Sequence, residues 1–159
     1  MDLFEVAIKL EEDGAQFYTE LAKKTSSDGF ANIFSMLAED EKKHENIFRA
    51  LQQRNAPISV SSTAIETAKT IFRAFNPDAF SPEEDQIPAY EEALAIEKKS
   101  IDFYKEQLPT VVFDAEKKAL NQILAEEQKH YAILEEILKL VTRPHRWVEN
   151  AEFGVREDY

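Results

Sequence analysis

Apolar residues along the chain recur at intervals of three, four and seven positions, which is the spacing of one face of an α-helix. In the first such segment Phe4, Ile8 and Ala15 follow one another in this way. The third segment starts after Ser81 and Pro82, a pair typical of a helix N-cap followed by a first-turn proline. Four helices are therefore predicted, at roughly 2–24, 29–53, 83–108 and 114–142.

The links between the predicted helices differ in length. Only a few residues separate the first helix from the second and the third from the fourth, so each pair is predicted to form an antiparallel hairpin. The second and third helices are separated by a crossover, 54–82, that contains a candidate short helix at 62–75. Two hairpins joined by a long crossover form the ferritin-like kind of four-helix bundle. We expect one all-α domain over residues 1–142, with the tail 143–159 docked on it.

The two predicted hairpins resemble each other in sequence. When residues 5–48 are compared with 91–134 without gaps, 11 of 44 positions are identical, whereas this composition would give about three by chance. His44 aligns with His130, and a glutamate stands three positions before each histidine. The repeat predicts a bundle with pseudo-twofold symmetry.

The composition narrows the kinds of site that this chain can carry. The 159 residues are 43% hydrophobic, which is enough for a packed core. Only 3 glycines are present, which argues against turn-rich β folds. The net charge of −12 argues against a nucleic-acid partner. The absence of cysteine excludes disulfides, zinc–thiolate sites and iron–sulfur clusters ligated by this chain. No apolar run approaches the ~20 residues of a membrane span, and no signal peptide is recognisable, so we expect a cytoplasmic protein without membrane partners.

The inward stripe of each predicted helix should be apolar, yet each one is interrupted near its middle by polar residues. The first and third helices each carry a single glutamate there, whereas the second and fourth each carry a glutamate followed three positions later by a histidine. The six residues are Glu11, Glu41, His44, Glu97, Glu127 and His130.

Buried carboxylates in such positions need compensation. Burying a lone charge costs several kcal/mol, and pairing or metal binding is the usual remedy. No lysine or arginine shares the stripe, whereas two divalent cations would balance the four carboxylates. A glutamate from each of two helices plus Glu-x-x-His from the other two is the ligand set of di-iron and di-manganese carboxylate bundles. Such ligands also suit zinc, and the alternative is a buried, partly protonated polar network.

The segments that carry these residues resemble the rubrerythrin-like branch of the ferritin-like superfamily. They are AIKLEEDGAQFYTELA at 7–22, LAEDEKKHENIF at 37–48, ALAIEKKSIDFY at 93–104 and LAEEQKHYAIL at 124–134. The resemblance implies that the six residues are metal ligands and that Glu41 and Glu127 bridge two metal ions.

The resemblance also implies roles for four residues that neighbour these ligands. Tyr18 and Tyr104 would donate hydrogen bonds to ligating carboxylates, although both could equally be ordinary core aromatics. Asp40 would meet the imidazole of His130, and by the pseudo-twofold symmetry Glu126 would meet that of His44. The alternative for these two acids is a solvated position on the helix surface.

Three departures from related proteins affect the expected chemistry. The chain has no four-cysteine rubredoxin domain, so electrons would come from an external donor protein such as a rubredoxin. The residues after Glu97 are Lys98, Lys99 and Ser100, where peroxidase-type rubrerythrins carry an additional glutamate, so ligand exchange through that glutamate is not expected. Lys42 replaces the haem-ligating methionine of bacterioferritin, so no haem is expected.

The sequence thus predicts a non-haem dinuclear centre that contains iron, with manganese or zinc as alternatives. The resemblance implies a di-iron oxidoreductase that acts on peroxide or dioxygen in oxidative stress, in a homodimer or larger homo-oligomer. One alternative is a ferroxidase or iron-handling protein with the same ligands. A third possibility is a non-catalytic helical interaction module with zinc or no metal in its core.

Overall fold

The computed structural model describes residues 2–53, 62, 64–75 and 86–142, and it has an all-α, ferritin-like architecture. The start of the helix predicted at 83–108 adjoins residues outside the described ranges, and every other helix end lies within two residues of its predicted position. Ser81, Pro82 and the tail 143–159 lie outside the described residues, so the predicted cap and the predicted docking of the tail remain predictions. The helices are α1 (Leu3–Lys24), α2 (Asp28–Gln52), α3 (Ala64–Ala74), α4 (Gln86–Gln107) and α5 (Asp114–Thr142), with a short 3-10 turn, η2 (Leu108–Thr110), before α5.

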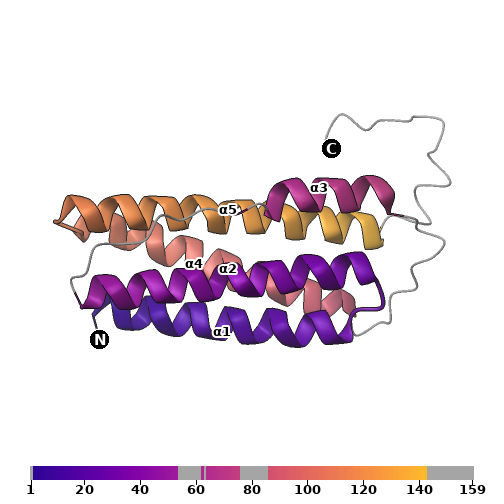
Figure 1. Cartoon of the computed structure of the whole chain (residues 1–159), viewed down its shortest axis with the longest axis horizontal. Coiled ribbons are helices and arrows are strands. Elements are labelled where there is room, and N and C mark those ends of the chain that lie inside the picture. The colour runs from indigo at the N-terminus through magenta and orange to yellow at the C-terminus, as the bar shows by residue number, and fades with distance from the viewer. Residues whose placement is uncertain (1, 54–61, 63, 76–85, 143–159) are drawn as a thin grey trace.

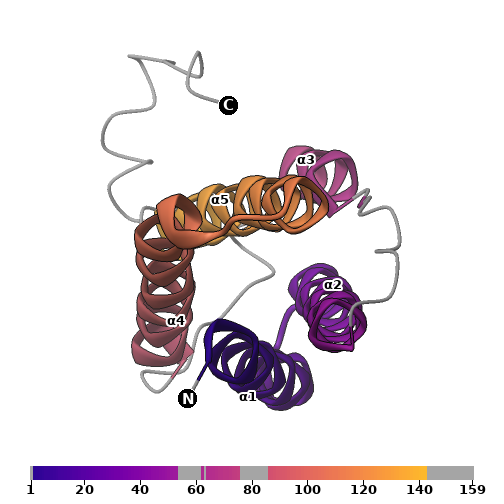
Figure 2. The same cartoon turned by 90° about the vertical axis from the view of Figure 1, so that its left-hand side faces the viewer.

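The four long helices of the described chain, α1, α2, α4 and α5, lie side by side along the long axis of the molecule (Figure 1). α1 pairs with α2 and α4 pairs with α5, and each pair is an antiparallel hairpin, as the short links predict. The end-on view in Figure 2 shows the two hairpins facing each other, with α3 outside the four-helix arrangement. α3 contacts both α2 and α5, so the crossover helix covers the seam between the two hairpins.

Side-chain caps fix the starts of three helices. The Asp2 side chain accepts a hydrogen bond from the Glu5 amide at the start of α1. Ser27 accepts one from the Phe30 amide, so α2 begins at Asp28, one residue before its predicted start. The Ser62 hydroxyl accepts a hydrogen bond from the Ala64 amide at the start of α3. Each cap satisfies a backbone N–H that has no partner within the helix.

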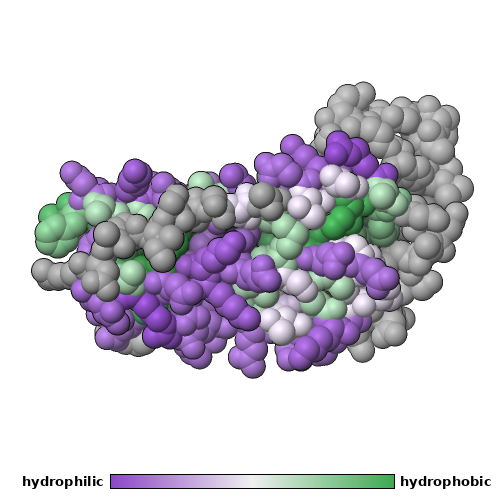
Figure 3. Space-filling view, viewed as in Figure 1, coloured by the Kyte–Doolittle hydropathy of each residue, from purple (hydrophilic) through white to green (hydrophobic). Residues whose placement is uncertain are grey.

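The buried apolar residues form two clusters, one toward each end of the bundle. On each long helix, the predicted glutamates and histidines lie between residues that belong to one cluster and residues that belong to the other. The face shown in Figure 3 is mostly hydrophilic, as expected for helices whose apolar stripes point inward. A polar layer therefore lies in the middle of an otherwise apolar interior. Within the described ranges, no helix combines the length and apolar character that crossing a membrane requires.

Candidate metal centre

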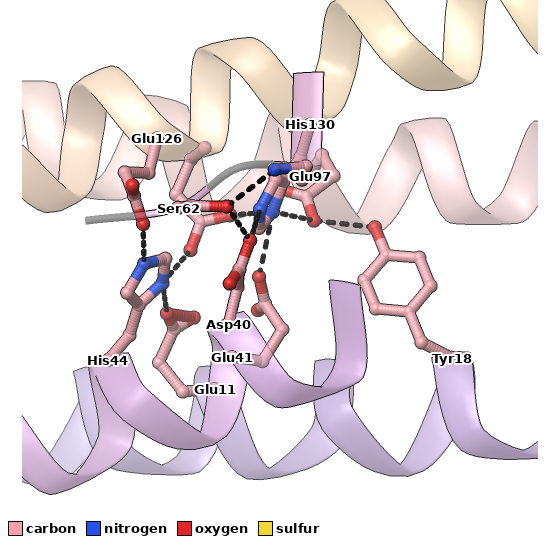
Figure 4. Close-up of polar contacts among 11 residues, drawn as sticks. Glu11, Tyr18, Asp40, Glu41, His44, Ser62, Glu97, Glu126 and His130 are labelled. Carbon is pink, nitrogen blue, oxygen red and sulfur yellow. Dashed lines mark hydrogen bonds and ion pairs between the residues drawn. The ribbon is translucent and has the colours of Figure 1, made fainter. Parts of the chain in front are cut away.

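The structure brings all six predicted site residues together in this polar layer. Each of them is at most 1% exposed, which is far below what an ordinary surface glutamate would show. Figure 4 shows side chains from the two hairpins converging on one another across the bundle. The i,i+3 spacing within α2 and within α5 places each glutamate–histidine pair on one helix face.

The six residues form two overlapping groups of metal-ligand atoms. Glu11, Glu41, His44 and Glu127 offer four such atoms that lie within 4.8 Å of one another. The second group combines Glu41 and Glu127 with Glu97 and His130 under the same limit. Glu41 and Glu127 belong to both groups, which is the arrangement that carboxylates shared between two ions require.

Both imidazoles turn their Nδ1 atoms toward the carboxylates. His44 Nδ1 lies 2.7 Å from Glu11 Oε1 and 3.0 Å from Glu127 Oε1. His130 Nδ1 lies 3.1 Å from Glu41 Oε1. The two rings are nearly parallel, with centroids 5.9 Å apart. Each histidine therefore presents the same nitrogen to the centre of the cluster.

The outer nitrogen of each imidazole contacts an acid on the opposite hairpin. His44 Nε2 lies 2.9 Å from Glu126 Oε1, and His130 Nε2 lies 3.0 Å from Asp40 Oδ2 (Figure 4). Both contacts that the resemblance implied are therefore present. A carboxylate accepts, so Nε2–H donates, and a neutral imidazole then keeps a lone pair on Nδ1 for the cluster.

Sequence reasoning missed one participant, Ser62 in the crossover. Its hydroxyl donates to Asp40 Oδ2 at 2.6 Å, and the same carboxylate oxygen contacts His130. The serine thus caps α3 and also holds the acid that orients an imidazole. A serine at the first position of the predicted short helix is a sequence signal for a cap, but the sequence has no signal for its contact with α2.

The two tyrosines differ in their contacts. The Tyr18 hydroxyl donates to Glu97 Oε1 at 2.5 Å, as the resemblance implied. The Tyr104 hydroxyl is buried but has no hydrogen-bond partner within the described part of the chain. Its ring instead packs against Phe48, with centroids 5.5 Å apart. The pseudo-twofold symmetry of the sequence is thus not carried through to these hydroxyls.

The crowded carboxylates shift one another's proton affinity. Burial, followed by the charge of neighbouring carboxylates, raises the pKa of Glu11, Glu41 and Glu97 well above the usual range. Burial acts in the same direction on Glu127, but interactions with Glu97 and the two histidines outweigh it and lower the pKa of Glu127 well below that range. Without a metal, Glu127 is therefore the cluster carboxylate that ionises most readily.

Burial alone would lower the pKa of each histidine, but contacts with carboxylates raise it. Burial lowers the pKa of His44, but hydrogen bonds with Glu126 and Glu127 outweigh it and raise that pKa from 6.5 to about 10. For His130 the same loss of solvation is outweighed by the hydrogen bond with Asp40 and by the ligand carboxylates that surround the ring, so its pKa is also raised. In the metal-free protein, the protonated imidazoles therefore place positive charge beside the buried carboxylates.

Buried polar atoms without partners test whether these residues suit a metal. Among the described residues, one oxygen of each cluster glutamate makes no hydrogen bond, and neither does His130 Nδ1, whose nearest carboxylate oxygen is Glu41 Oε1 at 3.1 Å. Buried polar groups without a hydrogen bond are rare in folded proteins, because the solvation that each loses is not fully compensated. All five are of types that bind iron, manganese or zinc, so the donor set fits two divalent cations. The atoms are Glu11 Oε2, Glu41 Oε1, Glu97 Oε2, Glu127 Oε2 and His130 Nδ1.

Comparison with known proteins agrees with this geometry. The profile of the rubrerythrin family matches residues 2–138, a range that spans both hairpins and all six clustered residues. No curated protein and no solved structure gives a significant match. The family implies a dinuclear metal site, and the buried glutamate–histidine cluster is where such a site would lie. Because the matched range covers most of the chain, the chain belongs to the rubrerythrin family.

Proposed function

We propose that the protein is a non-haem di-iron oxidoreductase that acts on peroxide or dioxygen with electrons from an external donor protein, as part of an oxidative-stress response. The observation that carries the proposal is the pair of overlapping ligand groups, whose shared members are Glu41 and Glu127. Each of them has a buried oxygen that makes no hydrogen bond, Glu41 Oε1 and Glu127 Oε2, which supports metal binding. The proposed ligands are Glu11, Glu41, His44, Glu97, Glu127 and His130.

The surrounding residues would support such a centre in distinct ways. Bound iron would supply the change of oxidation state, and the chain would supply the ligands and a dry environment. Asp40 and Glu126 would hold the protons on the Nε2 atoms, which keeps both Nδ1 lone pairs directed inward. Tyr18 would hold Glu97 in place through its hydroxyl. The apolar clusters on either side exclude water and so strengthen every electrostatic interaction within the layer.

Anaerobic loading with ferrous iron tests the proposal. We expect about two irons per chain and a change in the absorption spectrum when peroxide or air is added. Protein loaded with zinc is the control and should show no spectral change, because zinc has no accessible redox step. Fewer than about two irons per chain, or no response to either oxidant, would contradict the proposal. Continued oxidation by air of ferrous iron added well beyond two irons per chain, with that iron as the only reductant, would instead favour the ferroxidase alternative.

Metal binding is expected to release protons and to tighten as the pH rises. The pKa of His44 is about 10 and that of His130 is also raised, so both rings carry an additional proton at neutral pH in the metal-free protein. A metal needs these nitrogens unprotonated, so about two protons or more should leave per chain at pH 7. Each released proton makes the apparent affinity rise about tenfold per pH unit.

Calorimetric titration with metal in two buffers of different ionisation enthalpy measures this release. The difference between the two heats gives the number of protons directly. Equal heats in both buffers, or an affinity that does not change between about pH 6 and pH 8, would show that the cluster is already deprotonated.

A further inference from the structure

Gly14 on α1 occupies an unusual place beside the cluster. It is buried within the helix, three positions after Glu11. A Cβ atom built on it would lie only 2.7 Å from Glu41 Oε2. The next two nearest atoms, at 3.5 and 3.6 Å, also belong to the Glu41 side chain. The space that a side chain at position 14 would fill is therefore taken by one carboxylate.

The backbone itself gives no reason for a glycine here. Position 14 lies inside a regular α-helix and does not have the positive φ angle that favours glycine. Glycine in a helix interior is less favourable than alanine, because it loses more conformational freedom on folding. Since no neighbouring backbone is among its three nearest atoms, close helix packing does not account for it either.

We propose that Gly14 is a positioning residue for Glu41, the glutamate shared by both ligand groups; the inference rests on the proposed metal centre. Glu41 Oε2 lies against the bare backbone of α1, while Glu41 Oε1 lies 3.1 Å from His130 Nδ1 on α5. The carboxylate therefore spans from one hairpin to the ligands of the other. A methyl group at position 14 would push it out of this place.

The pseudo-twofold repeat offers a comparison at Ser100. This residue lies three positions after Glu97 on α4, as Gly14 does after Glu11, and it is also small and only 2% exposed. Ser100 retains a Cβ atom, so α4 needs less space at this point than α1. Only α1, against which Glu41 packs, therefore requires a residue without a side chain at this position.

The Gly14→Ala variant separates positioning from ordinary packing. A metal-free Glu41 side chain is flexible at its far end and can swing aside, so alanine should leave the melting temperature of the metal-free protein unchanged or raise it by about 2 °C. With metal, Glu41 has to stay in place. We therefore expect the affinity for Co²⁺, used as a spectroscopic probe, to fall by about 10- to 100-fold for both ions.

Two matched variants serve as controls in the same Co²⁺ titration. Gln16→Ala changes an exposed position on the same helix, and Ser100→Ala changes the repeat-related position while keeping its Cβ atom. Both should bind Co²⁺ within about threefold of the unaltered protein. An affinity for Gly14→Ala within the same range would overturn the inference. A metal-free melting temperature several degrees lower would also overturn it, because general packing damage would then explain the loss. Failure of the unaltered protein to bind Co²⁺ would instead overturn the proposed metal centre and, with it, this inference.

Discussion

Replacing Glu127 by glutamine is expected to lower the affinity for both metal ions by more than about 100-fold, beyond the 10- to 100-fold losses typical of residues that only support a ligand. The side chain belongs to both ligand groups. Its Oε1 lies 3.0 Å from His44 Nδ1 and its Oε2 lies 3.6 Å from His130 Nδ1. Glutamine preserves the size of the side chain but removes the charge and one of the two oxygens.

Glu127 should also matter more than a glutamate that serves one ion. Its pKa is lowered well below the usual range, so it is ionised at neutral pH. Glu11 belongs to only one group and has a raised pKa. The Glu11→Gln variant should therefore lose one tightly bound ion and keep the other.

Equilibrium metal titration of the two variants measures this difference. The matched control is Glu135→Gln, an exposed glutamate on the same helix as Glu127, which should bind both ions normally. If the Glu127 and Glu11 variants each lost a single ion, Glu127 would not be shared and the proposed bridging role would be wrong.

Removing the metal is expected to lower the melting temperature of the protein by roughly 15–30 °C. An ion present at 1,000 times its dissociation constant stabilises the folded state by about 4 kcal/mol, and two such ions give about 8 kcal/mol. For a domain of this size, each kcal/mol shifts the melting temperature by about 2–4 °C. The unfolded chain should not bind the metal, because the ligands come from all four long helices and meet only in the folded bundle.

Thermal melts of metal-free and metal-loaded protein, followed by circular dichroism, test this expectation. The Glu127→Gln variant is the control: with an affinity more than about 100-fold weaker, the same metal concentration is at most about 10 times the dissociation constant, so the stabilisation by two ions should fall from about 8 to below about 3 kcal/mol. Melting temperatures within about 3 °C of each other for the two forms of the unaltered protein would mean that the metal is held weakly or outside the bundle.

The fold could be predicted closely because its signals are local. Amphipathic spacing defines each helix within its own segment, and link length determines which helices pair. The observed ends of α1 and α5 show this, since they lie within one residue of the predicted ranges. The short helix of the crossover also appears within its predicted range, as Ala64–Ala74.

Contacts that depend on how helices approach one another were less accessible to sequence reasoning. Ser62 in the crossover contacts Asp40 on α2, and Gly14 on α1 leaves space for the side chain of Glu41 on α2. A serine or a glycine at such a position is not unusual in itself. Only the relative placement of the backbones reveals which side chain uses the hydroxyl or the space.

The sequence by itself determined the set of clustered residues, because helical spacing and the 86-residue repeat place four glutamates and two histidines on inward faces at the same level of the bundle. The tertiary structure decided how these residues are used. It placed Glu41 and Glu127 in both groups, turned each Nδ1 inward, and gave Tyr18 but not Tyr104 a hydrogen bond to a carboxylate within the described residues. The physical reason is that periodicity specifies only the direction in which a side chain leaves its helix. Hydrogen bonds, ligand sharing and proton affinities depend on distances between helices, where a shift of less than 1 Å makes or breaks a contact.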